Sequence, residues 1–136
     1  MKKALLAALL LLFAAPHAHT QDSPKINKRN LVVKEWITSS QTGKRYLDHV
    51  TVYNSDRKKI EETEYGVSGQ KWKKRYEYGK NGKCVKVLVY DEHNRLVSYK
   101  TFEYNEYGRK KVQYSYDAKG RLKSVKNFEY LVADDK

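Results

Sequence analysis

Hydrophobic and polar residues alternate along most of the chain beyond residue 30, with short interruptions that are rich in Gly, Asn and Asp. Alternation with a period of two residues, carried by β-branched and aromatic side chains, is typical of β-strands. The pattern therefore predicts an all-β fold, an antiparallel meander of about eight strands built from repeated hairpins. The predicted strands are residues 31–37, 44–53, 58–65, 70–78, 83–90, 95–104, 109–116 and 121–130.

The apolar residues of the later strands predict a single core face. The other face carries mostly Lys, Arg, Glu, Ser, Thr and Gln. The expected registers place Phe102 opposite Val112 and Tyr90 opposite Leu96, so the hairpin loops and the alternation agree. The predicted core face consists of Trp72, Tyr76, Tyr78, Cys84, Leu88, Tyr90, Leu96, Phe102, Tyr104, Val112, Tyr114, Tyr116, Leu122, Phe128 and Tyr130.

One short segment recurs where successive strands meet. Tyr116–Leu122 has the sequence Tyr-Asp-Ala-Lys-Gly-Arg-Leu, and Tyr90–Leu96 repeats it with Asn in place of Gly. Tyr104–Arg109 and Tyr78–Lys83 keep only the Tyr and the pair of Gly and a basic residue. Tyrosines recur at positions 53, 65, 78, 90, 104, 116 and 130, so two steps make a period of about 26 residues with one hairpin in each.

The spacing within this segment fits a three-residue hairpin loop, in which a type I turn precedes one residue with a left-handed backbone. An Asp or Asn at the first turn position hydrogen-bonds the backbone two residues on. The left-handed position favours Gly, with Asn next. Arg57 stands at the equivalent position of the turn at 54–57, which leaves that loop type open. The other loops place Gly82, Asn94, Gly108 and Gly120 there.

The segments at Tyr90 and Tyr116 resemble the YD repeat of RHS-type proteins, whose pattern is Tyr-Asp, two free residues and Gly-Arg-Leu. The likeness spans roughly residues 53–130, and Tyr116–Leu122 matches in full. The resemblance implies β-hairpin repeats, which in that family coil into a large shell; this chain has too few units to close one. Its layout also resembles small secreted bacterial proteins that contain domains of unknown function. Neither resemblance implies catalytic residues.

Residues 58–65 and 70–78 are rich in Glu and Lys, a composition that also suits a helix. Gly66 and Gly69 argue against a helix, and pairing the two segments about Ser68 brings opposite charges together. Such cross-strand pairs favour a hairpin. The expected pairs are Glu61 with Arg75, Glu62 with Lys74, and Lys59 with Glu77.

A single sheet with a tyrosine-rich face has to cover that face. Eight strands can close into a barrel that their own side chains fill, or the sheet can stay open and pair face to face with a second copy. We predict a strongly curled sheet or small barrel.

The N-terminal residues indicate that the protein is exported. Residues 1–20 have the features of a secretory signal peptide: Lys2 and Lys3, an apolar run and small residues. Cleavage after Thr20 or Ala18 fits this pattern. Residues 21–30 are predicted to be a flexible leader and 131–136 a tail, and no further apolar run predicts a membrane span. Without Lys2 and Lys3, 26 basic side chains face 16 acidic ones, a net charge of +10.

Basic residues on the predicted polar face form a candidate polyanion-binding site. Lys on exposed strands also prevents edge aggregation, so an ordinary solvated surface is the alternative. In an exported protein, the expected partner is an anionic glycan or cell-surface polymer, and no nucleic acid is expected. The candidate residues are Lys71, Lys73, Arg75, Arg109, Lys111, Arg121 and Lys123.

One strand pair is predicted to be apolar on both faces, because valines alternate with the core positions. This candidate partner patch consists of Val85, Val87, Val89, Val97 and Tyr99. Either residues 31–36 cover it, or it binds a second copy in a homo-oligomer or another partner.

Few residues suggest catalysis. Cys84 is alone, so it is a small hydrophobic residue, an intermolecular disulfide or a reactive thiol. His49 is predicted on a strand surface and His93 in a turn, and neither belongs to a metal-binding motif. We expect a non-catalytic secreted or periplasmic domain without cofactors that binds a macromolecule. The alternatives are a structural, self-assembling module and, with less support, a small hydrolase.

Overall fold

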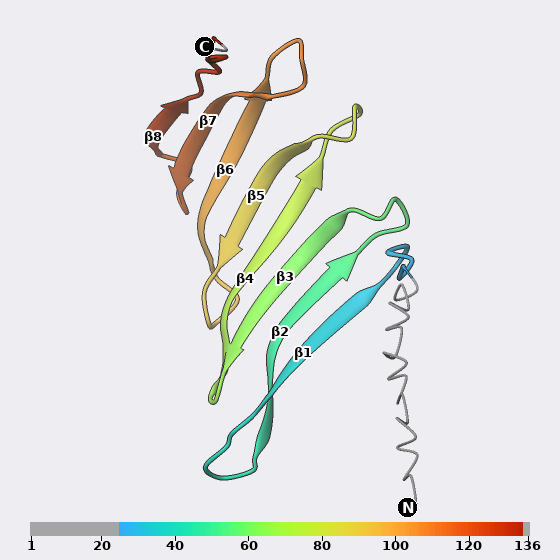
Figure 1. The fold of residues 1–136 in the computed structure, drawn as a ribbon. Coiled ribbons are helices and arrows are strands. Elements are labelled where there is room, and N and C mark those ends of the chain that lie inside the picture. The colour runs from blue at the N-terminus through green and yellow to red at the C-terminus, as the bar shows by residue number, and fades with distance from the viewer. Residues whose placement is uncertain (1–24, 135–136) are drawn as a thin grey trace, which may run out of the picture.

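The computed structural model describes residues 25–134, which form one eight-stranded antiparallel sheet (Figure 1). Each strand pairs with its neighbours in sequence, so the predicted all-β meander is confirmed. The predicted signal peptide, residues 21–24 of the leader and residues 135–136 of the tail lie outside the described residues. The strands are β1 (Val32–Thr38), β2 (Arg45–Tyr53), β3 (Lys59–Gly66), β4 (Gly69–Tyr78), β5 (Cys84–Tyr90), β6 (Leu96–Tyr104), β7 (Lys110–Asp117) and β8 (Leu122–Asn127).

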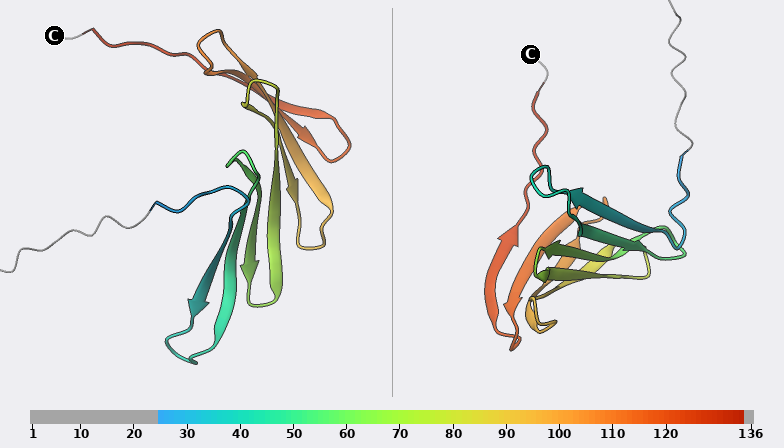
Figure 2. Two further views of the ribbon diagram at one scale, coloured as in Figure 1. Left: turned by 90° about the vertical axis from the view of Figure 1, so that its right-hand side faces the viewer. Right: turned by 90° about the horizontal axis from the view of Figure 1, so that it is seen from below.

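The sheet is a single twisted layer with two free edges (Figure 2). β1 pairs only with β2, and β8 pairs only with β7, so strong curling or closure into a barrel is not confirmed. β1 extends the sheet beside β2 and does not cover the valines of β5. Among residues 25–134, no helix has the length and apolar character needed to cross a membrane.

Every hairpin loop of the predicted type has the same backbone hydrogen bonds. The carbonyl of its first residue accepts a hydrogen bond from the N–H of the residue three positions later. The N–H of the first residue donates to the carbonyl of the residue four positions later. The left-handed residues are Gly82, Asn94, Gly108 and Gly120, as predicted, and also Arg57, at φ 63°. The loop at Asn54–Lys58 is therefore the same loop type, despite its arginine.

Asp at the first loop position explains the recurring Tyr-Asp pair. Asp117 Oδ1 accepts the backbone N–H of Lys119 at 3.0 Å and of Arg121 at 2.9 Å, and Oδ2 accepts Arg121 Nε at 2.6 Å. Asp91 binds His93 and Arg95 in the same way. The backbone N–H of the arginine lowers the pKa of each aspartate most, ahead of the other bonds and the arginine charge.

A β-bulge follows each of these loops. Tyr90 opposes Leu96 as predicted, but the preceding Val89 opposes Ser98, so Val97 is an extra residue in β6. A shift of one residue moves all following side chains to the other face of the sheet. The extra residues are Ile60, Val85, Val97, Lys111 and Lys123, each three positions after a left-handed residue.

The predicted single core face is therefore wrong, because the bulges divide its residues between both faces. Phe102 opposes Gln113 instead of Val112, and Val112 opposes Glu103. The registers define a Tyr90 face, with Leu88, Tyr90, Leu96, Tyr99, Val112, Tyr114, Tyr116 and Leu122. They also define a Tyr76 face, with Trp72, Tyr76, Tyr78, Cys84, Val87, Val89, Phe102 and Tyr104. β8 ends before Phe128 and Tyr130.

The described residues contain no buried hydrophobic side chain. Thr63, in the middle of β3, is the one buried residue among them, with 2 % of its surface exposed. Most strand side chains are half-buried against their neighbours in the same layer. Contacts within the sheet, rather than a second layer of the described chain, therefore hold this fold together.

The predicted charge pairs of the β3–β4 hairpin are confirmed in part. Glu61 opposes Arg75 and Glu62 opposes Lys74. The third expected pair is wrong, because the bulge at Ile60 places Lys59 on the Tyr76 face, where its Nζ pairs with Glu62 at 3.0 Å. Glu77 lies on the Tyr90 face, opposite Lys86 of β5.

Replacement of Arg57 by glycine is expected to stabilise the protein by up to about 1 kcal/mol, because a left-handed backbone strains a residue with a Cβ atom. Urea unfolding measures the change. Arg57→Ala is the matched control, since it removes the same charge and keeps the Cβ atom. Equal gains from both variants would attribute the effect to charge and contradict the backbone explanation.

Candidate functional site

The predicted polyanion-binding residues do not form one surface. Lys71 pairs with Glu64 at 3.6 Å, and Arg121 pairs with Asp117 at 2.6 Å. Lys73 and Arg75 both lie beside Glu61, at 3.7 Å and 3.8 Å. These ion pairs neutralise much of the charge that the sequence suggested.

The remaining three candidates lie apart from one another. Lys111 and Lys123 occupy bulge positions near opposite ends of β7 and β8. Arg109 lies in the loop between β6 and β7, with its guanidinium 5.4 Å from the centre of the Tyr130 ring. Of the predicted set, Arg109 alone lies in a loop with other basic side chains at the same end of the sheet.

Basic side chains gather in the loops at one end of the sheet. The loops β2–β3, β4–β5 and β6–β7 lie along this end, because neighbouring strands run in opposite directions (Figure 1). None of the ion pairs between described residues includes these side chains, although Asp56 and Glu106 lie in the same loops. We name this cluster the basic loop end: Arg57, Lys58, Lys80, Lys83 and Arg109.

One cation of each of these three loops lies over a tyrosine ring. The residue after the left-handed position extends over a tyrosine of the next hairpin unit, at a distance typical of cation–π contacts. Lys58 Nζ lies 5.1 Å from the Tyr78 ring centre, Lys83 Nζ 6.0 Å from Tyr104, and Arg109 Cζ 5.4 Å from Tyr130. Lys58 Nζ also donates a hydrogen bond to the Gly82 carbonyl, which joins two successive loops.

Hydrogen bonds fix these tyrosines across the strands. The Tyr78 hydroxyl donates to the Lys59 carbonyl at 2.6 Å, and the Tyr130 hydroxyl donates to the Lys110 carbonyl at 2.7 Å. Tyr104 makes the equivalent bond to Cys84. Burial is the largest cause that raises the pKa of Tyr78 and Tyr104, so both remain neutral donors at neutral pH.

The charge pattern of the sequence does not single out Lys58 and Lys83, although the repeat contains a signal for them. Each directly follows a left-handed residue, as Arg109 does, and a tyrosine follows each about 20 residues later. The opposite end of the sheet differs, since its loops pair Arg95 and Arg121 with Asp91 and Asp117.

A second cluster surrounds Glu62 on the Tyr76 face. Its carboxylate accepts hydrogen bonds from the Tyr76 hydroxyl at 2.6 Å and Lys59 Nζ at 3.0 Å, and His49 Nε2 lies 3.2 Å away. Burial, the largest contribution, opposes ionisation, but these partners outweigh it and lower the pKa of Glu62. Burial and the Glu62 bond raise the pKa of Tyr76. The network links β2, β3 and β4, and its carboxylate is already occupied by these partners.

The predicted valine patch is not one surface. Val87 and Val89 lie on the Tyr76 face, but Tyr99 lies on the Tyr90 face, where it stacks on Tyr116 with ring centres 4.8 Å apart. Val85 and Val97 occupy bulge positions. The register shift after each loop separates residues that simple alternation placed together.

Cys84 and the two histidines, the remaining candidate residues, contact neighbouring residues of the sheet or lie in a turn. Cys84 is half-buried, and burial, the largest contribution, raises the pKa of its thiol. His93 lies in a turn as predicted, whereas His49 contacts Glu62 and the Trp72 ring. Residues 25–134 contain no group of three or more His, Cys, Asp or Glu side chains placed to hold a metal ion.

No protein-family model, no curated protein and no solved structure matches this chain.

Proposed function

We propose that this protein is a non-catalytic, secreted or periplasmic β-repeat domain that binds an anionic polymer through the basic loop end. The supporting observation is a row of three cations, one from each of three alternate loops, that lie over tyrosine rings. None of these cations takes part in an ion pair between described residues. Each cation is held at a ring face, so less side-chain entropy is lost when a ligand binds.

The repeat also sets the spacing of these charges. Successive loops at one end are separated by two strand spacings, about 10 Å. An extended polymer that lies across the strand ends therefore meets Lys58, Lys83 and Arg109 in order. The predicted export favours an anionic glycan or cell-surface polymer over nucleic acid.

A second candidate function is that of a self-assembling module. The described sheet leaves apolar side chains on both faces without burying one fully. Further curling of the sheet, or stacking of a second copy on it, would remove these side chains from water. Sedimentation over a range of protein concentrations tests this candidate, and a monomer at all concentrations would contradict it.

The triple variant Lys58→Gln, Lys83→Gln, Arg109→Gln is expected to bind heparin or polygalacturonate at least about tenfold more weakly, because three charge-assisted contacts are lost. Titration at two salt concentrations measures the affinities. Binding by the original protein should weaken with salt, and the triple variant should respond less.

The matched control is Lys71→Gln, Arg95→Gln, Arg121→Gln, which removes the same number of charges from side chains that already pair with carboxylates. It should retain most of the affinity. Equal losses in both triple variants would show that net charge alone attracts the polymer and would contradict a site at the basic loop end. Absence of binding to either polymer would also count against the proposal.

A further inference from the structure

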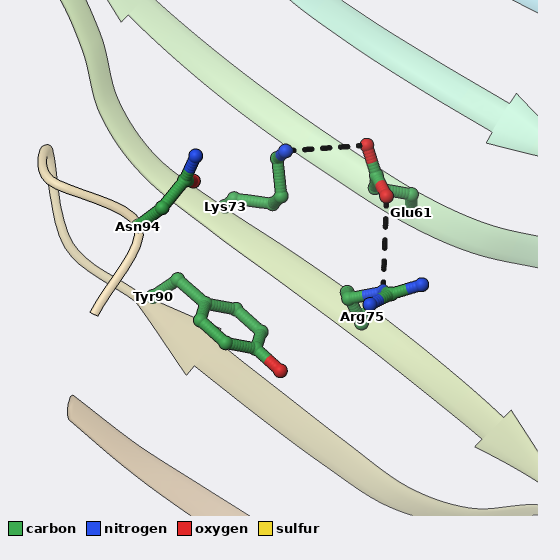
Figure 3. A pocket seen from close by; sticks show the side chains of 5 residues that line it. All are labelled: Glu61, Lys73, Arg75, Tyr90 and Asn94. Carbon is green, nitrogen blue, oxygen red and sulfur yellow. Dashed lines mark ion pairs between the residues drawn. The ribbon is translucent and has the colours of Figure 1, made fainter. Parts of the chain in front are cut away.

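A shallow hollow of about 290 Å³ lies on the Tyr90 face (Figure 3). One of its lining residues, Asn94, belongs to the β5–β6 loop, at the end of the sheet opposite the basic loop end. It is lined by Glu61 of β3, Lys73 and Arg75 of β4, Tyr90 of β5, and Asn94 of the β5–β6 loop. The hollow therefore collects charged, amide and aromatic groups from four successive elements of the sheet.

The two cations of the hollow retain hydrogen-bonding capacity. Lys73 Nζ lies 3.7 Å from Glu61 Oε1, and Arg75 Nε lies 3.8 Å from Glu61 Oε2, so neither contact is a hydrogen bond. Both cations reach the same carboxylate because residues two apart on a strand share a face. One carboxylate balances two cations, which leaves the hollow with a single positive charge.

Tyr90 and Asn94 add an aromatic surface and an amide donor. Figure 3 shows the Tyr90 ring beside Arg75 and the Asn94 amide on the far side of Lys73 from Glu61. Gln70 Nε2 donates to Asn94 Oδ1 at 2.9 Å, so the Asn94 NH₂ group is the part left for a ligand. Asn94 occupies a left-handed position, at φ 58°, where the neighbouring loops have glycine.

We propose that this hollow binds one sugar acid unit, of the uronate class. The ligand carboxylate pairs with Arg75 and Lys73, and a ring face of the sugar packs on Tyr90. Glu61 accepts hydrogen bonds from hydroxyl groups, and the Asn94 amide donates to another. The site is separate from the basic loop end, because it shares no residue with that cluster.

The combination of groups favours a sugar acid over simpler ligands. A small anion such as acetate uses the cations but neither the Tyr90 ring nor the Glu61 carboxylate. A neutral sugar leaves the single excess positive charge of the hollow without a counter-charge. A sugar acid uses all the groups that line the hollow, and its single negative charge matches the single excess positive charge.

Titration of the purified protein with D-glucuronate, D-glucose and acetate, followed by NMR chemical shifts, tests the proposal. Glucuronate is expected to saturate in the millimolar range, with shifts centred on the hollow, and glucose and acetate to bind at least about tenfold more weakly. Arg75→Gln should reduce glucuronate affinity about tenfold, and Asn94→Gly, which suits the left-handed backbone, should reduce it severalfold.

The control variant Arg121→Gln removes a charge that already pairs with Asp117, outside both the hollow and the basic loop end, and should leave glucuronate affinity unchanged. Equal affinities for acetate and glucuronate would reduce the hollow to simple ion pairing and overturn the proposal. Glucuronate binding that is unaffected by Arg75→Gln would overturn it as well. Loss of polymer binding in the triple variant with retained glucuronate binding would show that the two sites are independent.

Discussion

Replacement of Glu62 by alanine is expected to destabilise the protein by about 3 kcal/mol, because hydrogen bonds to a charged group contribute roughly 1.5–3 kcal/mol each and partners left unpaired add a penalty. The carboxylate joins Tyr76 and Lys59 and lies 3.2 Å from His49 Nε2. Its side chain is 19 % exposed, so water cannot fully replace these contacts. Urea unfolding followed by tryptophan fluorescence measures the loss.

Glu64→Ala is the matched control. Glu64 lies on the same strand and the same face, but its ion-pair partner Lys71 lies 3.6 Å away with 59 % of its side chain exposed. Exposed pairs contribute roughly 0–1 kcal/mol, so this variant should lose far less stability. Similar losses in the two variants would contradict a central role for the Glu62 network.

Raising the pH above 10 is expected to unfold the protein. Burial is the largest cause that raises the pKa of Tyr76, Tyr78 and Tyr104 above the ordinary value of 10.0, and Glu62 adds to the effect at Tyr76. A raised pKa in the folded state means that the neutral phenol stabilises the fold. This contribution is complete below pH 10 and is lost as the pH rises through the folded-state values.

Two measurements over pH 8–12 test the alkaline transition: tyrosinate absorbance and far-UV circular dichroism. The two signals should change together, because ionisation and unfolding are linked. Tyr78→Phe removes one linked proton and should make the loss of stability with pH less steep, whereas Tyr107→Phe, at a side chain that is 80 % exposed, should not. Full ionisation of the tyrosines near pH 10 with unchanged dichroism would contradict the prediction.

The elements of this fold could be predicted because their signals are local. Alternation placed all eight strands to within a few residues, and the pairing of Tyr-Asp with Gly-Arg identified the loops. The backbone bonds of Asp117 and Asp91 act within five residues of sequence. Even Arg57 follows the rule, because the rest of its loop has the hydrogen bonds of the others and imposes the left-handed backbone on it.

The candidate site could be predicted only in part. Arg109 was identified from its charge, but charge alone also selected Lys73 and Arg121, which have carboxylate partners. Whether a basic side chain is free or paired depends on which carboxylate lies nearby, and the pairing of the strands and loops determines this. Lys58 and Lys83 were missed because their role depends on tyrosines in the next hairpin unit.

The sequence by itself determined the strands, their order and the loop type, because turn chemistry and alternation act between near neighbours. Only the tertiary structure decided the faces. One extra residue after each loop reverses the direction of the side chains that follow, so Leu88 and Tyr76 lie on opposite faces although both were assigned to one core. Bulges depend on how two strands pair, and hydrophobic alternation along one strand does not contain that information.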